Sequence, residues 1–368
     1  MTAFHCPRSC DAVAGPRHVL PGPRDGCSGG DLRGTPVSGG ASVAIQPAVE
    51  AGGCLGSAIL LIWPGSRLPA CCANCVRGPE SSVRLTAVRM IGPVESPRGF
   101  GLQDHMCWVH GDDRDYRPRL TEFFGEGLER GLQVAYLGAG NVEELREHLD
   151  RFVDVGPLLT REDIRIISFD EIYRAGEPVV PAEVMKKYAA ATQEALADGY
   201  RGLRISADVT DLVRAPEQQD AFARFEFLLE RYSSRHPLSA LCEYRLELGD
   251  AVTQFACMHA AVPTGLTPFQ VFACDDGAVG LLGEFDAACQ AGFKRALQSI
   301  QPAPDDSTLI FDMSAVRFMD HRALLALDSY AQQCPVPVVV RSMPRVVRRV
   351  ARVLGLEHLG SVRKGGSG

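Results

Sequence analysis

The sequence predicts an α/β protein made of two units that follow an N-terminal extension. Three observations lead to this prediction. Short apolar segments alternate five times with helical segments over about 155 residues, which is typical of a parallel sheet covered on both faces. A second, shorter series then begins with two strands joined by a hairpin signal. The length of 368 residues is itself too great for one average domain.

The first 100 residues differ in composition from the rest of the chain. They hold 15 of the 37 glycines and 11 of the 24 prolines. This content of glycine and proline is typical of a segment that cannot build a packed core. We therefore expect residues 1–99 to be a disordered extension, and we interpret Met90 as the true start of translation.

Composition also limits the classes of function. A formal net charge of −7 and a pI near 5.8 argue against binding of nucleic acid by charge. No run of 18 apolar residues is present, so we expect no membrane span. The six cysteines after residue 100 are scattered, which is typical of the cytoplasm, the location we expect. Cys71, Cys72 and Cys75 lie close together, but no second pair follows at zinc-site spacing.

The first unit is expected to begin near residue 100 and to end at 262. Its strands are predicted at 106–109, 134–137, 164–169, 203–207 and 240–246. Its helices are predicted at 118–130, 142–149, 181–198, 216–235 and 251–259. Pro118 suits the first position of a helix, where its missing N–H costs little. Asn141 and Glu144 have the spacing of a capping box.

The second unit is expected to span 269–362, after a linker at 264–268. Two strands at 270–273 and 278–283 flank Asp-Asp-Gly, a hairpin signal. The remaining elements are predicted as a helix at 287–300, a strand at 308–313, a helix at 321–334, a strand at 336–341 and a helix at 344–354. The predicted order is therefore ββαβαβα.

Two motifs of the second unit resemble the STAS domain of anti-sigma-factor antagonists. Gly-Glu-Phe-Asp at 283–286 stands where that family has Gly-Glu-Leu-Asp. Asp-Met-Ser-Ala-Val-Arg-Phe-Met-Asp at 312–320 is similar to the family's Asp-Leu-Ser-Gly-Val-x-Phe-Ile-Asp. The resemblance implies that this unit binds an anti-sigma factor or a kinase of the GHKL type.

The chain departs from the STAS family at the residues after that last aspartate. The family continues with Ser-Ser-Gly, and its first serine is phosphorylated by the partner kinase. His321, Arg322 and Ala323 replace these residues, so no hydroxyl accepts a phosphate there. His321 offers either a weaker protonation switch or a fixed contact, and we favour the contact. The resemblance implies a partner surface formed by Asp320, His321, Arg322, Ala323 and Leu324.

Four motifs of the first unit resemble the MEDS family, a sensory domain named for methanogens, methylotrophs and the DcmR regulator. They are Asp-His-Met-Cys-Trp-Val at 104–109, Glu-Gly-Leu at 126–128, Gly-Tyr-x-Gly-Leu-Arg at 199–204 and Ala-Leu-Cys-x-Tyr at 240–244. The resemblance covers 100–262. It implies a RecA-like fold that senses small organic, hydrocarbon-derived ligands and is often fused to signalling output domains.

A RecA-like fold raises the question of ATP binding. A P-loop needs Gly-x-x-x-x-Gly-Lys-Ser/Thr to hold phosphates. Residues 109–115 read Val-His-Gly-Asp-Asp-Arg-Asp, without the second glycine, the lysine or the hydroxyl. Gly-Ala-Gly-Asn at 138–141 is best interpreted as a tight turn. A degenerate NTPase is therefore an alternative and not the main hypothesis.

Ligands of parallel α/β sheets bind beyond the carboxyl ends of the strands. Asp208 follows the fourth strand, and Asp211 lies close to it. Glu226 and Arg204 are candidates for a polar rim, but for Arg204, which lies on a central strand, we favour a structural ion pair over the rim. The candidate ligand-binding residues are His105, Cys107, His110, Asp208, Glu226 and Cys242.

His105 and Cys107 are two residues apart on one strand, so their side chains share a face of the sheet. Cys242 lies on the fifth strand, and Cys257 and His259 follow it. Three interpretations stay open for these residues: packing alone, a pocket for an organic ligand, or a metal or redox centre that uses His105, Cys107 and Cys242.

We therefore expect a bacterial, cytoplasmic signalling regulator that is not an enzyme and has no cofactor. Its first unit would bind a small organic ligand, and its second unit would bind an anti-sigma factor or a GHKL-type kinase. Neither nucleic acid nor a membrane is an expected partner. Ligand binding would shift the population between two arrangements that expose or hide the surface at 320–324.

Overall fold

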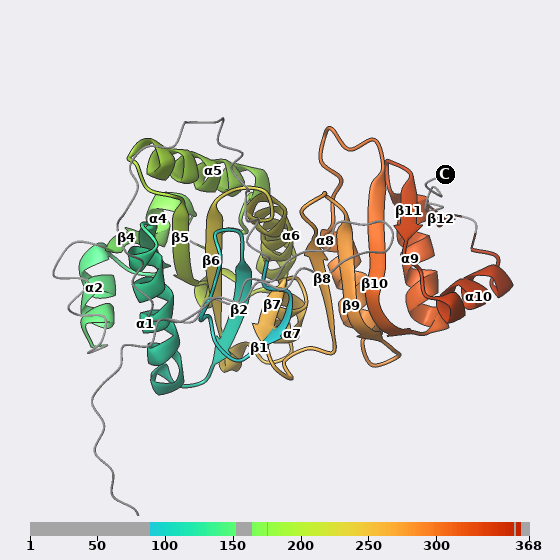
Figure 1. The fold of residues 1–368 in the computed structure, drawn as a ribbon. Coiled ribbons are helices and arrows are strands. Elements are labelled where there is room, and N and C mark those ends of the chain that lie inside the picture. The colour runs from blue at the N-terminus through green and yellow to red at the C-terminus, as the bar shows by residue number, and fades with distance from the viewer. Residues whose placement is uncertain (1–88, 152–163, 175, 357, 362–368) are drawn as a thin grey trace, which may run out of the picture. The chain divides into compact units, whose positions relative to one another are not determined.

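Two β-sheets organise the chain in a computed structural model that describes residues 89–151, 164–174, 176–356 and 358–361 (Figure 1). These residues belong to one compact unit, Ser81–Gly368. Residues 1–88 of the predicted extension, with Cys71, Cys72 and Cys75, lie outside the described residues.

The first sheet confirms the predicted parallel α/β domain. Within the described residues it has seven strands in the order β1-β7-β2-β6-β5-β3-β4, and all paired neighbours are parallel. The strands are β1 (Gly92–Val94), β2 (His105–His110), β3 (Gln133–Gly138), β4 (Ile164–Ser168), β5 (Leu203–Asp208), β6 (Leu238–Arg245) and β7 (Ala261–Pro263). β1 and β7 were not predicted. Residues 92–94, which the sequence assigned to the extension, pair with β7 and belong to the sheet.

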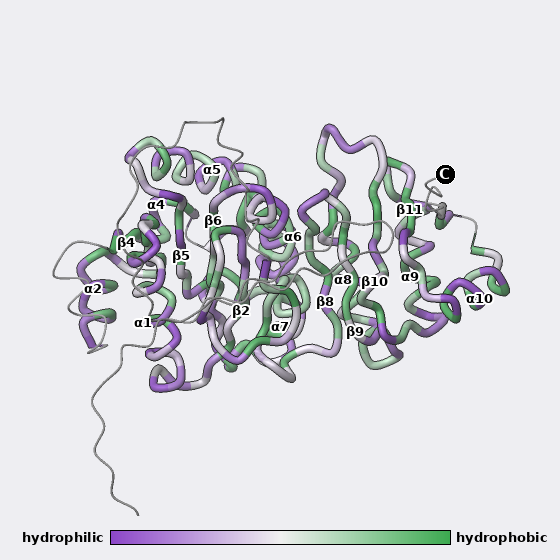
Figure 2. The backbone as a smooth tube through the Cα atoms, viewed as in Figure 1, coloured by the Kyte–Doolittle hydropathy of each residue, from purple (hydrophilic) through white to green (hydrophobic). Residues whose placement is uncertain are grey.

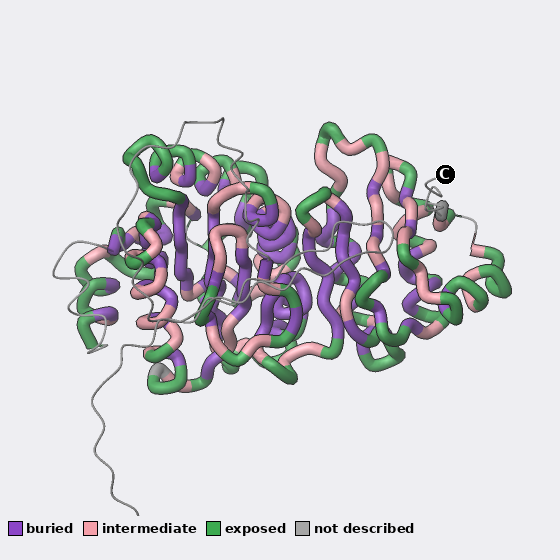
Figure 3. The backbone as a smooth tube through the Cα atoms, viewed as in Figure 1, coloured by how far each residue is buried: buried purple, intermediate pink, exposed green. Residues whose placement is uncertain are grey.

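Helices cover both faces of this sheet. They are α1 (Asp113–Glu129), α2 (Val142–Asp150), α4 (Phe169–Ile172), α5 (Pro181–Ala197), α6 (Pro216–Ser233) and α7 (Ala251–Ala256), with short 3₁₀ turns η1 (Thr210–Leu212) and η2 (Leu246–Leu248). α1 and α2 pack against one face, and α5, α6 and α7 pack against the other. α6 is largely buried from Ala221 to Ser233 (Figure 3).

α1 begins five residues before the predicted start. Asp112 caps the helix by accepting a hydrogen bond from the backbone N–H of Arg114 at 2.8 Å. An acidic cap also stabilises the positive end of the helix dipole. Pro118 therefore lies inside the helix, at the cost of one backbone hydrogen bond. The predicted capping box of Asn141 and Glu144 at α2 is confirmed.

The second sheet confirms the predicted ββαβαβα order and adds one short strand. Its strands are β8 (Phe269–Ala273), β9 (Val279–Phe285), β10 (Leu309–Met319), β11 (Val338–Arg341) and β12 (Gly360–Ser361). Its helices are α8 (Gln290–Ser299), α9 (His321–Gln333) and α10 (Arg345–Val353). The order is β12-β11-β10-β9-β8, with β8 and β9 antiparallel and the other pairs parallel.

β10 continues six residues beyond its predicted end at 313. Its pairing with β9 shifts register between Asp312 and Ala315 and again between Val316 and Phe318. Such irregularities break the period-two alternation from which a strand is read, so the sequence pattern stopped at the first of them.

The two sheets are joined by a shared core. Phe227 of α6, together with Cys257 and Met258, packs in the same apolar cluster as the strands β8 and β9. These two strands are both hydrophobic and buried (Figures 2 and 3). The backbone N–H of Val271 donates to the carbonyl of Cys257 at 2.7 Å. The side chain of Gln270 donates to the carbonyl of His259 at 2.9 Å.

Arg204 corrects a prediction. It was expected in an ion pair, or else at a polar rim, but it is fully buried on β5 and the groups to which it donates are neutral. Its guanidinium donates to the carbonyls of Phe123 at 3.0 Å and Phe100 at 2.6 Å, and to the hydroxyl of Ser239 at 3.3 Å. Burial lowers the pKa of Arg204 to about 10. The side chain ties α1 and the segment before β2 to the sheet.

We expect Arg204→Met to destabilise the protein by at least about 2 kcal/mol, because two buried carbonyls lose their donor and each costs about 1–3 kcal/mol. Arg201→Met is the matched control, since Arg201 is exposed. Urea denaturation followed by tryptophan fluorescence measures the difference. Equal midpoints for the two variants would contradict the role given to Arg204.

Candidate functional site

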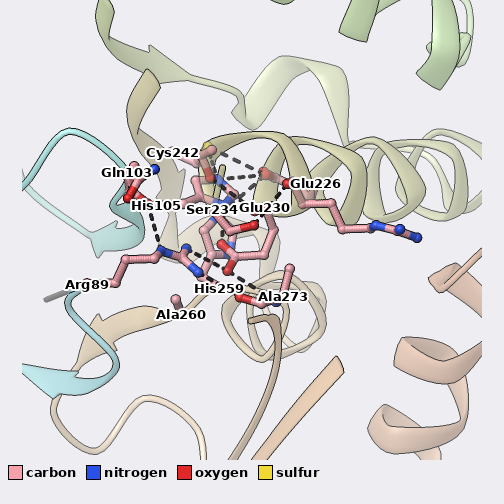
Figure 4. A network of polar contacts seen from close by, with 12 residues as sticks. Arg89, Gln103, His105, Glu226, Glu230, Ser234, Cys242, His259, Ala260 and Ala273 are labelled. Carbon is pink, nitrogen blue, oxygen red and sulfur yellow. Dashed lines mark hydrogen bonds and ion pairs between the residues drawn. The ribbon is translucent and has the colours of Figure 1, made fainter. Parts of the chain in front are cut away.

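Four buried side chains converge between the first sheet and α6 (Figure 4). His105 comes from β2, Cys242 from the neighbouring strand β6, Glu226 from α6, and His259 from the segment after α7. One polar atom of each lies within 4.8 Å of the corresponding atom of every other. The Nε2 atom of His105 lies 3.2 Å from Oε2 of Glu226 and 3.3 Å from Sγ of Cys242.

The remaining distances are similarly short. Sγ of Cys242 lies 3.6 Å from Oε2 of Glu226. Nε2 of His259 lies 3.5 Å from the same oxygen, and it has no hydrogen-bond partner among the described residues. Oε2 of Glu226 is therefore the point on which the other three groups converge.

Outer hydrogen bonds fix the orientation of each imidazole. Nδ1 of His105 donates to Oε2 of Glu230 at 2.9 Å, and Nδ1 of His259 donates to the carbonyl of Phe255 at 2.8 Å. A carboxylate and a carbonyl only accept, so both Nδ1 atoms carry the proton. Both Nε2 atoms therefore face the centre of the cluster. Tyr244 donates its hydroxyl to the other oxygen of Glu226.

Glu230 connects this cluster to two other segments. Arg89 forms an ion pair with its Oε1 at 2.8 Å, and the backbone N–H of Ala273 on β8 donates to the same atom at 3.3 Å. Arg89 also donates to the carbonyl of Ala273. Figure 4 shows the guanidinium of Arg89 reaching between Glu230 and Ala273. A single carboxylate thus joins β2, β8 and the segment before β1.

Burial and neighbouring charges oppose each other at these groups. Burial favours a neutral His105, but hydrogen bonds to Glu226 and Glu230 raise its pKa to about 9. Burial favours a neutral Glu230, but the charge of Arg89 and the hydrogen bond from His105 lower its pKa to about 2. Burial and the charge of His105 lower the pKa of His259 to about 4. Burial and the charge of Glu226 raise the pKa of the Cys242 thiol.

Glu243 on β6 is a second buried acid with the opposite behaviour. Burial is the larger cause that raises the pKa of the Glu243 carboxyl well above its usual range, and the charge of Asp208 is the second cause. Among the described residues, its carboxyl accepts a hydrogen bond from Ser206 and has no ion pair like the one between Glu230 and Arg89. Burial therefore favours the neutral form of Glu243, whereas the charge of Arg89 favours the ionised form of Glu230.

A polar cleft of about 430 Å³ opens at the carboxyl ends of β3, β5 and β6. Asp208 accepts a hydrogen bond from Arg245 at 3.3 Å at its wall. Arg214 bridges Asp211 at 2.7 Å and Glu247 at 3.1 Å. Charges of both signs therefore line the cleft, at the edge where parallel sheets bind ligands.

The structure separates the predicted site residues into two groups. It brings His105, Glu226 and Cys242 together in the buried cluster and places Asp208 in the cleft. Glu226 was expected on the rim, and this prediction was wrong, because its position on α6 faces the interior of the sheet.

The two remaining predicted residues join neither group. Cys107 lies in register with Cys242 and packs in the apolar core, outside the four converging groups. The His110 ring stacks on Tyr116 at 4.6 Å, on the opposite face from the cluster.

Sequence reasoning missed the roles of Glu230, Arg89 and Tyr244 and did not select His259. The sequence did contain a signal for Glu230. Glu226 and Glu230 lie four residues apart on the apolar face of α6, which also carries Phe222 and Leu229. Two acids on such a face predict buried partners.

The predicted partner surface lies at the start of α9. Asp320 caps the helix by accepting a hydrogen bond from the N–H of Ala323 at 2.8 Å. His321 and Arg322 are exposed. Ala323 and Leu324 are buried and cannot contact a partner, which corrects the prediction for these two residues. Their side chains face inward because they lie on the apolar side of an amphipathic helix.

Comparison with protein-family models decides the identity of the two domains. Residues 104–260 match the model described as MEDS, the methanogen/methylotroph, DcmR sensory domain. Residues 274–364 match the STAS domain model. The chain is a MEDS domain followed by a STAS domain. Both are regulatory domain types, and their fusion is that of a signalling regulator.

The buried cluster and the polar cleft therefore both belong to the MEDS domain, and α9 belongs to the STAS domain. Comparison with curated proteins finds none that matches this chain. Among the residues that the structure describes, no helix is long and apolar enough to cross a membrane.

We expect Glu230→Gln and Glu243→Gln to differ strongly in stability. Glu230→Gln leaves the charge of Arg89 without its buried carboxylate and leaves His105 with Glu226 alone, which should cost about 3–5 kcal/mol. Glu243→Gln replaces one neutral group by another and should cost under about 1 kcal/mol. Urea denaturation at pH 7 measures both variants.

The stability contribution of Glu230 also depends on pH. Its pKa in the folded protein, about 2, is below its ordinary 4.5. The contribution is therefore complete above about pH 4.5 and is lost as the pH falls toward 2. A large loss of stability in Glu243→Gln at pH 7 would contradict this assignment of protonation states.

Proposed function

We propose that this chain is a cytoplasmic signalling regulator that acts by binding and not by catalysis. Its MEDS domain binds a small organic ligand, and its STAS domain passes the ligand state to an anti-sigma factor or a GHKL-type kinase. The observation that carries the proposal is the polar cleft at the carboxyl edge of the MEDS sheet. It occupies the position at which α/β sheets receive ligands.

The cleft favours a small ligand that has at least one polar or charged group. Asp208 supplies a carboxylate, and Arg214 and Arg245 supply guanidinium groups from two different strand ends. Its volume of about 430 Å³ lies within the range of small-molecule sites. A small hydrocarbon-derived compound with an acid, amine or hydroxyl group fits both the volume and the charged lining of the cleft.

A nucleotide is a poorer match for the MEDS domain. Phosphates bind at a helix start that offers free backbone N–H groups and a lysine. The start of α1 instead carries the carboxylate of Asp112, which accepts the N–H of Arg114 and pairs with its side chain at 2.6 Å. The degenerate NTPase therefore gains no support from this helix.

The STAS surface that we assign to the partner is the exposed part of the α9 start. It consists of His321, Arg322 and Leu325, with Phe318 two residues before the helix cap. Phe318 and Leu325 are about half exposed, at 52% and 46%. An apolar pair beside an arginine suits an interface with a charged rim. Because no serine follows Asp320, binding there is set by conformation and not by serine phosphorylation.

Coupling between the two domains rests on direct contacts. Arg231 of α6 pairs with Asp306 at 2.9 Å, and Gln254 of α7 accepts a hydrogen bond from Arg295 of α8 at 3.1 Å. A ligand that repositions the helices of the MEDS domain therefore also acts on the STAS domain. The ligand shifts the population toward the arrangement that it binds better.

Native mass spectrometry of the full chain, before and after denaturation, tests ligand binding. We expect a small organic mass that leaves on denaturation and whose occupancy falls at least about tenfold in Asp208→Asn, because the variant loses one charged contact. Asp198→Asn, an exposed acid outside the cleft, is the control. A bare mass from wild-type protein, with no thermal shift by short-chain acids, amines or alcohols, would refute the sensing role.

Partner binding is tested by pull-down and interferometry with purified GHKL-type anti-sigma kinases. We expect wild-type protein to bind, and Arg322→Glu to weaken binding by about tenfold or more, because it reverses a charge at the interface. The control is Arg146→Glu, an exposed arginine on α2 of the MEDS domain. Equal affinity of wild type and Arg322→Glu would show that the interface lies elsewhere. Absence of binding under every ligand condition would refute this partner class.

A further inference from the structure

Two imidazoles, a thiol and a carboxylate converge in the interior of the MEDS domain. We infer that His105, Glu226, Cys242 and His259 form a binding site for a divalent transition metal ion of the zinc class. This inference goes beyond ligand sensing at the cleft and does not depend on it, because the two sites have no residue in common.

The spacing of the four groups matches tetrahedral coordination. A zinc ion with bonds of about 2.0–2.3 Å holds its ligand atoms about 3.3–3.8 Å apart. Four of the six distances in the cluster lie between 3.2 and 3.6 Å. The two distances from His259 to His105 and to Cys242 are within 4.8 Å. Closing them needs a small displacement of one ring.

The orientation of the side chains also matches a metal site. Histidine ligands of metals usually donate their second N–H to a carboxylate or a carbonyl. Nδ1 of His105 donates to Glu230 and Nδ1 of His259 donates to Phe255, so the Nε2 atoms of both rings face the centre, where a bound ion would displace the proton that Nε2 of His105 shares with Glu226. Tyr244 donates to Oε1 of Glu226 and leaves Oε2 for the ion.

Nε2 of His259 is the observation that simple packing does not explain. His259 is fully buried, and no described residue donates a hydrogen bond to its Nε2 atom. A buried acceptor without a donor costs free energy. A metal ion at the centre of the cluster would satisfy this lone pair.

Charge favours a dication. A metal ion of charge +2 with one thiolate and one carboxylate is neutral, and neutral assemblies are tolerated in the interior. The outer pair of Glu230 and Arg89 is balanced separately. Mixed nitrogen, sulfur and oxygen ligands select zinc-class metals over magnesium or calcium, which prefer oxygen alone.

The site has the character of a structural centre. Its four ligands come from β2, α6, β6 and the segment after α7, and all are buried. Four protein ligands complete a tetrahedron and leave no position for a substrate, as in closed structural zinc sites. The ion would join both central strands to α6 and to the segment that leads into the STAS domain.

The test uses the full chain, because Arg89 precedes Met90 and supports the site. Metal ions are first removed from the protein with a chelator. The metal-free protein is then titrated with Zn²⁺ or Co²⁺, and bound metal is quantified by inductively coupled plasma mass spectrometry. We expect one ion per chain, a thiolate-to-cobalt absorption band, and a higher melting temperature with Zn²⁺ but not with Mg²⁺.

The variants distinguish this site from the metal or redox centre at His105, Cys107 and Cys242 that the sequence left open. Cys242→Ser should abolish the thiolate-to-cobalt band, and His259→Gln should weaken Zn²⁺ binding at least about a hundredfold. Cys107→Ser, a buried cysteine in the adjacent strand, should retain both. Circular dichroism of each metal-free variant establishes that it is folded.

Two results would overturn the inference. One is wild-type protein that takes up no stoichiometric Zn²⁺ or Co²⁺, which needs no variant to interpret. The other is metal bound equally by wild type, Cys242→Ser and His259→Gln, which would place the ion elsewhere. Neither result bears on the proposed ligand site in the cleft, since Asp208→Asn tests that site separately.

Discussion

The burial of two carboxylates one helical turn apart on α6 is the constraint on which the centre of the MEDS domain depends. Glu226 and Glu230 project from a helix whose other buried side chains are apolar apart from Ser233. A buried charge is tolerated only when it is paired and hydrogen-bonded. The partners come from distant parts of the chain, namely Arg89, His105 and Tyr244. Satisfying two charges therefore fixes the positions of β2, β6 and the segment before β1 relative to α6.

The same constraint reaches the STAS domain. Ala273 on β8 donates its backbone N–H to Glu230 and accepts a hydrogen bond from Arg89, so an edge strand of the second sheet is part of the polar network of the first domain. β8 presents its other edge to β9, whose parallel partner β10 leads into α9. Packing and hydrogen bonds thus run without interruption from the buried cluster to the helix that we assign to the partner.

The sequence predicted the fold better than the site, because the fold is indicated by local patterns and the site is formed by residues far apart in the sequence. Alternation of strands and helices is a local signal, and it identified both sheets, although three-residue strands such as β1 and β7 are too short to show a period. The site depends on contacts between residues 125 and 137 positions apart, such as His105 with Glu230 and with Cys242. Face arguments within β2 placed His105 correctly, but they also selected Cys107, because only the neighbouring helix decides which side chain on a face has a polar partner.

The shared core limits how the two domains can communicate. Phe227, Cys257 and Met258 are almost fully buried in the same cluster as the STAS strands. Swinging the STAS domain away about residues 264–268 would expose these side chains to water, at roughly 25 cal/mol for each Å² of apolar surface. It would also break the ion pair between Arg89 and Glu230 or the hydrogen bonds to Ala273. The change of state that we propose would therefore proceed more readily by small shifts of packed elements than by separation of the domains. Such a route needs no covalent modification, which agrees with the histidine that replaces serine after Asp320.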